Sequence, residues 1–214
     1  RGIAKSSRGS APCTIDQLAQ DCLAVLDACD IKTAMVVGHS TGGCIAQTMA
    51  LLAPDRIQAC VFSATWGKPS RHRKELFSTR RDMLFRDPVG YACSSVFMGH
   101  DAHWLNNNWS VLENARANAP VTPEAQRIVA ERLDALIAFD RSAEIQNIKA
   151  PTLVMGARDD LIVPSFLQEE LVTTLKDANF HLFEQGGHFY PVTRTTLFCS
   201  YVLTWLNSAV RLVS

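Results

Sequence analysis

A serine with small neighbours stands at the centre of the clearest chemical motif in the chain. Residues 38–42 read GHSTG, a G-x-S-x-G pattern that follows an apolar run at 33–37 and precedes a helical pattern at 41–53. A sharp turn from strand to helix needs glycines beside the serine, and it exposes the hydroxyl above the sheet edge. Ser40 is therefore the predicted nucleophile, and the backbone N–H of Thr41 is the predicted oxyanion donor at the helix N-terminus. An ordinary glycine-rich turn is the alternative.

Two segments farther along the chain can supply the partners of an activated serine. The sequence GARDDLIVP follows a predicted buried strand at 151–155, and QGGH follows a predicted strand at 179–184. Because the carboxyl ends of parallel strands meet at one edge of a sheet, both segments should lie beside Ser40. We expect His188 to be the general base, since the two glycines before it let its loop approach the serine closely.

The acidic partner of the histidine has two candidates in adjacent positions. Asp159 and Asp160 both lie in the loop after 151–155, and neighbouring side chains in a loop cannot both face one imidazole. The carboxylate that is not used would face solvent, where pairing with Arg158 would contribute little. The residues by themselves leave this choice open.

The surrounding elements predict an α/β fold. Residues 14–30 show the apolar spacing of one helix face, and 57–63 is another short apolar run that suits a buried strand. Helix, strand, helix and strand thus alternate in the first third of the chain. The alternation resumes in the last third, which ends in a predicted helix at 192–206. A mostly parallel sheet flanked by helices fits this order.

The middle of the chain has a different character. Residues 66–149 are denser in charge and hold helical patterns but no convincing buried strand, which predicts an inserted helical cap. Pro123 suits the first position of one cap helix, and Arg132 lies among the leucine and isoleucine residues of that helix's apolar period. The predicted division is a core in two parts, 1–65 and 150–214, separated by the cap.

The composition limits the classes of partner. Lys plus Arg and Asp plus Glu each total 21, so no overall charge attracts the chain to nucleic acid or to an anionic membrane. Neither a signal peptide nor an apolar run of membrane-spanning length is found, which favours a cytoplasmic protein. The seven cysteines form no C-x-x-C pair and are expected to be reduced core residues. No metal-ligand spacing occurs, so we expect a small-molecule substrate without a metal or other cofactor, in an undetermined oligomeric state.

These motifs give the chain a resemblance to the α/β-hydrolase superfamily of serine hydrolases. The resemblance lies in GHSTGG at 38–43, PTLVMGARDDLIVP at 151–164 and GGH at 186–188. In that family the acid commonly stands four residues before a proline, which is the position of Asp160 relative to Pro164. The resemblance therefore implies the α/β-hydrolase fold and selects Asp160 as the acid.

A closer resemblance lies in the cap and its junctions. The segments FSATWGKPSRHRKELFSTRRDMLF and ERLDALIAFDRSAEIQNIKAPTLV resemble 3-oxoadipate enol-lactonases and the related aminoacrylate or carbamate hydrolases of pyrimidine breakdown. This resemblance implies a small, polar or carboxylated substrate, with Trp66, Arg71, His72 and Arg73 as candidate contacts near the cap entrance. From the residues alone, we expect the basic cluster that continues to Arg81 to be the solvated face of a helix, and a phosphate-binding patch is the alternative.

The first residues resemble the end of the D-x-R-G-x-G-x-S turn of the same family, with Ala4 in place of a glycine. The resemblance then implies that the first strands, and the loop with the second oxyanion donor, lie upstream of Arg1. Loss of one oxyanion donor typically lowers turnover by about 10²- to 10³-fold. We therefore expect a longer parent protein to be an enzyme. The fragment alone should be nearly inert and poorly soluble, since the strand at 33–37 would present an apolar edge.

Acyl transfer to water is the predicted reaction. Ser40 attacks the carbonyl of an ester, lactone or carbamate, and His188 takes the serine proton and later protonates the leaving group. Asp160 holds the imidazole in the required tautomer. Two rival interpretations are a cofactor-free haloperoxidase or perhydrolase, which resembles these hydrolases and keeps the same three residues, and a non-catalytic binding protein of the same fold.

Overall fold

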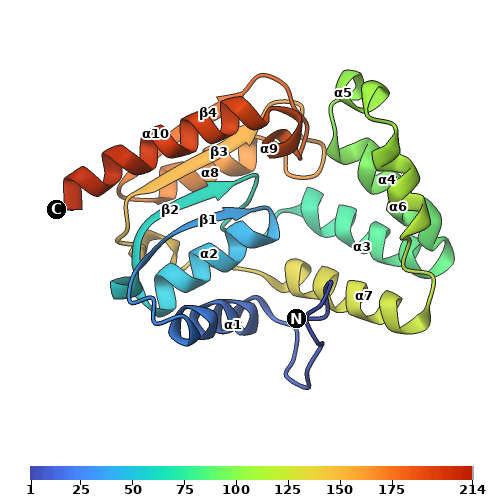
Figure 1. The fold of residues 1–214 in the computed structure, drawn as a ribbon, viewed down its shortest axis with the longest axis horizontal. Helices are drawn as coiled ribbons and strands as arrows, with labels where there is room; N and C mark the ends of the chain where they lie inside the picture. Colours follow the sequence, from blue (N-terminus) through green and yellow to red (C-terminus); the bar gives the residue numbers. More distant parts are fainter. Residues whose placement is uncertain (214) are drawn as a thin grey trace.

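Four parallel strands form one sheet within residues 1–213, the part of the chain that the computed structural model describes. In spatial order they are β1 (Ala34–His39), β2 (Ile57–Ser63), β3 (Thr152–Ala157) and β4 (Ala178–Phe183). All four arrows point in one direction in Figure 1, toward the side on which the helices between β2 and β3 lie. The loops that follow β1, β3 and β4 therefore leave the sheet at the same edge, where residues from distant segments can meet.

Helices cover both faces of this sheet (Figure 1). One face is covered by α1 (Ile15–Ala28), α2 (Thr41–Leu52) and α8 (Phe166–Thr174), and the other by α10 (Thr195–Val213). The short turns are η1 (Pro54–Arg56), η2 (Ile145–Asn147) and α9 (Tyr190–Thr193). Phe62 of β2 packs against Met49 on the first face, and Met155 of β3 packs with Val202 on the second. The predicted fold class, an α/β sheet flanked by helices, is confirmed.

The described chain between β2 and β3 contains helices but no strand. These helices are α3 (Arg71–Arg86), α4 (Pro88–Gly99), α5 (Ala102–Asn107), α6 (Ser110–Ala117) and α7 (Pro123–Ala138). α3 packs against both α7 and α4, and α4 packs against α6. The predicted start of α7 is confirmed, because Thr122 Oγ1 accepts a hydrogen bond from Ala125 N at 3.2 Å and Pro123 is the first helical residue. The domain boundaries stay a prediction.

Two details of burial differ from the sequence-based expectations. β1 is an edge strand of the described sheet, and Val37 is 46% exposed, so this strand is less buried than its unbroken apolar run suggests. The cysteines are free thiols, but Cys44 and Cys60 are the buried ones among the described residues, while others lie partly or fully exposed. The expectation that the cysteines are core residues therefore holds for these two.

Ala4 adopts a φ of 51°, a conformation typical of the glycine that the resemblance places there.

None of the helices among the described residues is long and apolar enough to cross a membrane. In the same part of the chain, no group of three or more histidine, cysteine, aspartate and glutamate side chains is arranged to hold a metal ion.

Candidate active site

Ser40 lies at the turn between β1 and α2. The strand ends one residue before it and the helix begins one residue after it, and Ser40 has φ 54° and ψ −117°. Its backbone N–H donates to Ser63 O at 2.8 Å, which ties the turn to the end of β2. A Cβ on Gly38 would come within 2.2 Å of Gly42 O, so this close approach requires a glycine at 38. A Cβ on Gly42 would meet open space, so the predicted need for a small residue does not hold there.

The backbone of Ser40 predicts an unusual effect of glycine at this position. L-residues rarely adopt φ 54° with ψ −117°, and holding one there costs about 1–3 kcal/mol. Ser40→Gly removes this strain and Ser40→Ala keeps it. In urea denaturation we expect the glycine variant to have a free energy of unfolding about 1 kcal/mol higher than the alanine variant. Equal stability of the two variants would show that the turn stores no strain.

Asp160 and His188 form a buried hydrogen-bonded pair. Asp160 Oδ2 lies 2.8 Å from His188 Nδ1, and the two side chains are 0% and 3% exposed. The other carboxylate oxygen, Oδ1, accepts the backbone N–H groups of Ile162 and Val163, both at 2.8 Å. Asp160 therefore has a single fixed orientation, with one oxygen on its own loop and the other on the imidazole.

Asp159 holds the loop that carries the histidine. Its two carboxylate oxygens accept the backbone N–H groups of Gly186 and Gly187, at 3.0 and 2.9 Å. We call residues 184–189 the histidine loop. The interpretation of Asp159 as a solvent-facing partner of Arg158 is wrong. The two adjacent carboxylates have separate tasks, one on the imidazole and the other on the backbone just before it.

A second histidine lies directly against His188. The ring centroids of His39 and His188 are 4.9 Å apart. His39 Nδ1 lies 2.9 Å from Ser63 Oγ, which is hydrogen-bonded in turn to the Tyr190 hydroxyl, whereas His39 Nε2 has no partner among the described residues. Burial, and to a smaller extent His188, lower the pKa of His39 to about 3, so this imidazole is neutral at neutral pH. Sequence patterns do not predict the hydrogen bonds that link His39, Ser63 and Tyr190, because the three residues come from separate segments of the chain.

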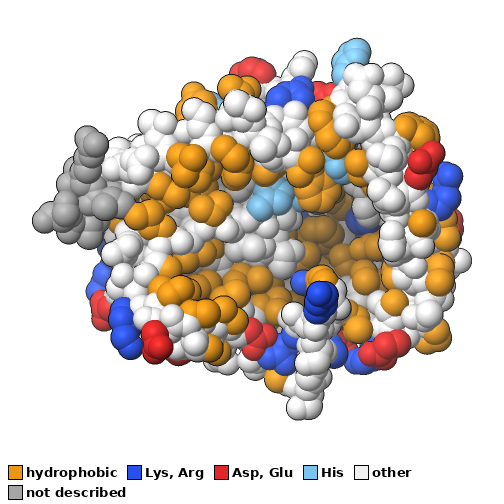
Figure 2. Space-filling view, in the orientation of Figure 1, with side chains coloured by type: hydrophobic (Ala, Val, Ile, Leu, Met, Phe, Trp, Pro, Cys, Tyr) orange, Lys and Arg blue, Asp and Glu red, His pale blue; other side chains and the backbone are white. Residues whose placement is uncertain are grey.

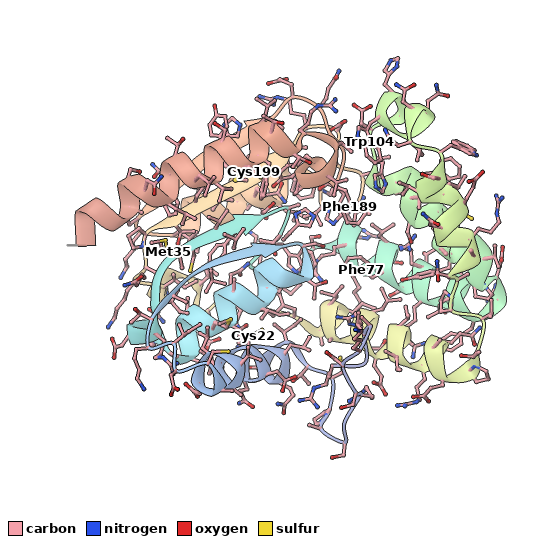
Figure 3. The ribbon with its side chains drawn as sticks, in the orientation of Figure 1. Cys22, Met35, Phe77, Trp104, Phe189 and Cys199 are labelled. Atoms are coloured by element: carbon pink, nitrogen blue, oxygen red, sulfur yellow. The ribbon has the colours of Figure 1, made fainter. Side chains whose placement is uncertain are left out.

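The cap helices contact the histidine loop at the corner between α4 and α5. Phe189 N donates to Gly99 O at 2.7 Å, and Arg194 Nη2 donates to Asp101 Oδ2 at 2.8 Å. Figure 3 shows Phe189 and Trp104 where these two parts of the chain meet. The His100 ring lies between them, stacked on Trp104 and 5.0 Å from the Phe189 ring centroid. The position of the histidine loop therefore depends on the cap as well as on the sheet.

A pocket opens beside the turn that holds Ser40. It has a volume of about 420 Å³, and Thr41 is one of its lining residues. The other lining residues come from α4, α7 and the segment between α6 and α7, namely Tyr91, Asn118, Pro120, Val129, Arg132, Leu133 and Leu136. Figure 2 shows this face of the molecule hollowed between the same elements, with hydrophobic side chains inside the hollow. As the first residue of α2, Thr41 has a backbone N–H without a partner inside the helix.

The four side chains predicted to contact substrate lie elsewhere. Trp66 and Arg73 are 0% exposed, and the Arg73 guanidinium lies 4.3 Å above the centre of the Trp66 ring. Arg71 and His72 are exposed at the start of α3. Trp66 lines a different cavity of about 210 Å³, which is bounded by α8 and η2. None of the four is among the described residues that line the pocket beside Thr41.

Comparisons with known proteins agree with this architecture. The profile of the α/β-hydrolase fold family matches residues 1–194. A protein of Caulobacter segnis that carries the name carbamate hydrolase RutD is 30% identical over 212 residues, which cover 98% of this chain and 79% of the relative. The protein of the same name from Azorhizobium caulinodans is 28% identical over 203 residues, covering 94% and 77%. The structure of the enol-lactonase from Burkholderia xenovorans superposes with a TM-score of 0.85 at 24% identity, over 97% of this chain and 78% of that one. The chain therefore belongs to the α/β-hydrolase family.

Proposed function

We propose that the protein is a serine-dependent hydrolase that cleaves a small ester, lactone or carbamate through an acyl-enzyme. It is a hydrolase by family, and the proposal adds the nucleophile and the bond. The observation that carries the proposal is the buried 2.8 Å hydrogen bond between Asp160 Oδ2 and His188 Nδ1. The His188 ring centroid lies 4.9 Å from that of His39, the residue before Ser40, which has a positive φ. A fixed acid and imidazole beside a strained serine are the parts that activate a hydroxyl for attack.

The proposed mechanism follows from the proton on His188. Because the Asp160 carboxylate accepts a hydrogen bond from Nδ1, that nitrogen carries the proton and Nε2 keeps a lone pair. Nε2 takes the proton of the Ser40 hydroxyl as the oxygen attacks the carbonyl, and the Thr41 N–H stabilises the resulting oxyanion. The imidazolium then protonates the leaving group as its bond to the carbonyl carbon breaks. Water repeats the two steps on the acyl-enzyme and releases the acid.

The size of the pocket and the names of the relatives support a small substrate. The pocket of about 420 Å³ lies at the lower end of the range for small-molecule sites. The Caulobacter and Azorhizobium relatives are named carbamate hydrolases, and the Burkholderia structure is that of an enol-lactonase. Both reactions begin with attack of a nucleophile on an sp² carbonyl carbon, which suits an activated serine with the oxyanion donor at Thr41 beside it.

Labelling with a fluorophosphonate tests the nucleophile. Attack by the Ser40 oxygen on phosphorus displaces fluoride and leaves a stable phosphonyl ester. We expect intact-mass spectrometry to show one adduct per wild-type chain, peptide mapping to place it on Ser40, and the Ser40→Ala variant to acquire none. An adduct that persists in Ser40→Ala, or an unlabelled wild-type chain, would overturn the proposal. A panel of short esters, lactones and carbamates then identifies the bond that is cleaved.

A further inference from the structure

Ser63, the last residue of β2, holds the turn of Ser40 at two points. Its backbone oxygen accepts the Ser40 N–H at 2.8 Å, and its Oγ lies 2.9 Å from Nδ1 of His39, the residue before Ser40. His39 and Ser63 are paired at the ends of the parallel strands β1 and β2. Ser63 is 0% exposed, so its hydroxyl is available to buried partners only. The backbone of the proposed nucleophile and the ring beside it are therefore fixed to the same residue.

Tyr190 joins Ser63 to the histidine loop. Its hydroxyl is hydrogen-bonded to Ser63 Oγ, and its backbone N–H donates to Gly187 O at 3.3 Å. Tyr190 is 0% exposed and stands two residues after His188. The hydrogen bonds from His39 through Ser63 to Tyr190 therefore join the turn of the proposed nucleophile to the segment that carries the proposed base. We call these three residues the bridge.

The imidazole of His188 needs more than one contact to keep its orientation. The hydrogen bond between Nδ1 and Asp160 fixes one atom of the ring, but the terminal torsion of a histidine side chain is broad, so the ring can still tilt about that bond. Two neighbouring rings limit the tilt. The His39 centroid lies 4.9 Å from that of His188, with 47° between the planes, and the Phe189 centroid lies 5.2 Å away at 68°. Of these two rings, His39 is the one that the bridge holds.

Packing alone does not explain a histidine at position 39. Its Nε2 is buried without a hydrogen-bond partner in the described part of the chain, and an unpaired polar atom in the interior is destabilising. An apolar ring would fill the same space without that cost, but it could not form a hydrogen bond with Ser63 Oγ. Since burial, and to a smaller extent His188, lower the pKa of His39 to about 3, its ring stays neutral. It therefore does not oppose the positive charge that His188 acquires when it takes a proton.

We infer that His39 is a positioning residue for His188. Its ring, held in place by Ser63 and Tyr190, sets the tilt of the imidazole so that Nε2 faces the hydroxyl of the proposed nucleophile. The inference rests on the proposed function, and it adds how the base is kept in line with the serine. His39 acts through the ring of His188 and transfers no proton. Because a misplacement of reacting groups by about 1 Å can lower turnover about 10²-fold, a loosened base should reduce kcat far more than substrate binding.

Removal of the ring at position 39 tests this inference on the full chain. We expect His39→Asn to lower kcat for the neutral ester para-nitrophenyl hexanoate by about 10- to 100-fold, with KM within about twofold of the wild type. The matched control is His181→Asn, which removes another stacked imidazole, one that lies on β4 with its centroid 3.6 Å from that of the Tyr201 ring. Its kcat should stay close to that of the wild type. A wild-type kcat in His39→Asn, or a loss that appears in KM alone, would overturn the inference.

Tyr190→Phe separates positioning from a general role in folding. The substitution removes one hydroxyl and keeps the aromatic ring, so it loosens His39 only through Ser63. We expect it to lower kcat by about 3- to 10-fold in the wild-type background, the usual effect of losing one hydrogen bond. In the His39→Asn background it should cause no further loss, because the ring that the hydroxyl holds is absent there. Equal losses in the two backgrounds would mean that Tyr190 acts on the histidine loop directly, and the inference would fail.

The motion of the His188 ring can be measured by NMR without turnover. In the substrate-free chain with isotope-labelled histidine, the signal that is lost in His188→Gln identifies the Cε1–Hε1 group of His188. We expect relaxation dispersion, which reports exchange on the μs–ms timescale, to be absent for this signal in the wild type and present in His39→Asn and in Tyr190→Phe. In His181→Asn the signal should behave as in the wild type. A rigid His188 in both bridge variants would contradict the inference even if kcat falls.

The two kinds of measurement distinguish the inference from the proposed function. If the wild-type chain cleaves no ester but His188 becomes mobile in the bridge variants, the proposed function fails and the positioning role stands. If the chain cleaves the ester through Ser40 and neither kcat nor the mobility of His188 depends on His39, the positioning role fails and the proposed function stands. Thermal unfolding shows which variants fold. Should His39→Asn not fold, a folded Tyr190→Phe chain with wild-type kcat and a rigid His188 would by itself rule out the positioning role.

Discussion

Ser40→Ala is expected to lower kcat for hydrolysis of para-nitrophenyl hexanoate by about 10⁴-fold or more. The substitution removes the hydroxyl that forms the acyl-enzyme and leaves the backbone of the turn as it is, because alanine keeps the Cβ. Asp160 and His188 remain hydrogen-bonded in this variant, but the imidazole has no hydroxyl to deprotonate. Initial rates measured at enzyme concentrations high enough to detect slow turnover give the size of the loss.

The control for this variant is Ser10→Ala, which removes a hydroxyl from an exposed position in the N-terminal segment. Its kcat should equal that of the wild-type chain. Residual activity of Ser40→Ala within about tenfold of the wild type would mean that another group attacks the carbonyl. Bromination that requires peroxide and Ser40, with little ester hydrolysis, would favour the perhydrolase interpretation instead.

The main strands and helices around the site could be predicted because each is encoded by a pattern of residues that are close together in the sequence. The apolar run at 57–63 has the bounds of β2. The strand predicted at 33–37 extends to His39, two residues into the G-x-S-x-G motif. Apolar periodicity alone underestimates it, because the last two residues of β1 are a glycine and a histidine that pair with β2.

Asp160 could be selected as the acid from its spacing to Pro164, whereas the structural role of Asp159 could not be predicted. The hydrogen bonds from the glycines of the histidine loop to Asp159 join residues that are 27 and 28 positions apart. No local pattern encodes such a contact. The same holds for the chain of groups from His39 to Tyr190, because Ser63 reaches both from the end of β2.

The burial of Arg73 and Arg80 was missed, although the sequence does contain a signal for it. Arg73 and Arg80 are buried along α3 together with Phe77 and Leu84, a spacing of four, three and four residues that marks one helix face. Phe77 and Leu84 thus identify the inward face, on which both arginines lie. The interruption of the apolar period of α7 by Arg132 is the corresponding signal for the pocket. A charged residue on an inward face needs a partner, and the identity of that partner depends on tertiary contacts.

Asp160→Asn is expected to lower kcat by about 10⁴-fold while the chain stays folded. The reason lies in the two hydrogen bonds at Oδ1, which accept the backbone N–H groups of Ile162 and Val163. In the variant the amide oxygen must occupy this position, because an NH₂ group cannot accept them. The NH₂ group then faces His188 Nδ1 and requires that nitrogen to be an acceptor. The proton moves to Nε2, which can no longer take the proton of Ser40.

Asp159→Asn is the matched control, since it makes the same chemical change one residue earlier. It weakens one of the two hydrogen bonds that hold the histidine loop, leaves the imidazole tautomer unchanged, and should lower kcat by no more than about 10- to 100-fold. Equal losses in both variants would mean that the position of the loop, and not the tautomer, limits the reaction. A loss confined to Asp159→Asn would transfer the orienting role to that carboxylate. We expect a much larger loss of kcat in Asp160→Asn than in Asp159→Asn. Both carboxylates accept hydrogen bonds at both oxygens. Only at Asp160 does one of these hydrogen bonds come from the imidazole of His188, and it decides which ring nitrogen can take the serine proton.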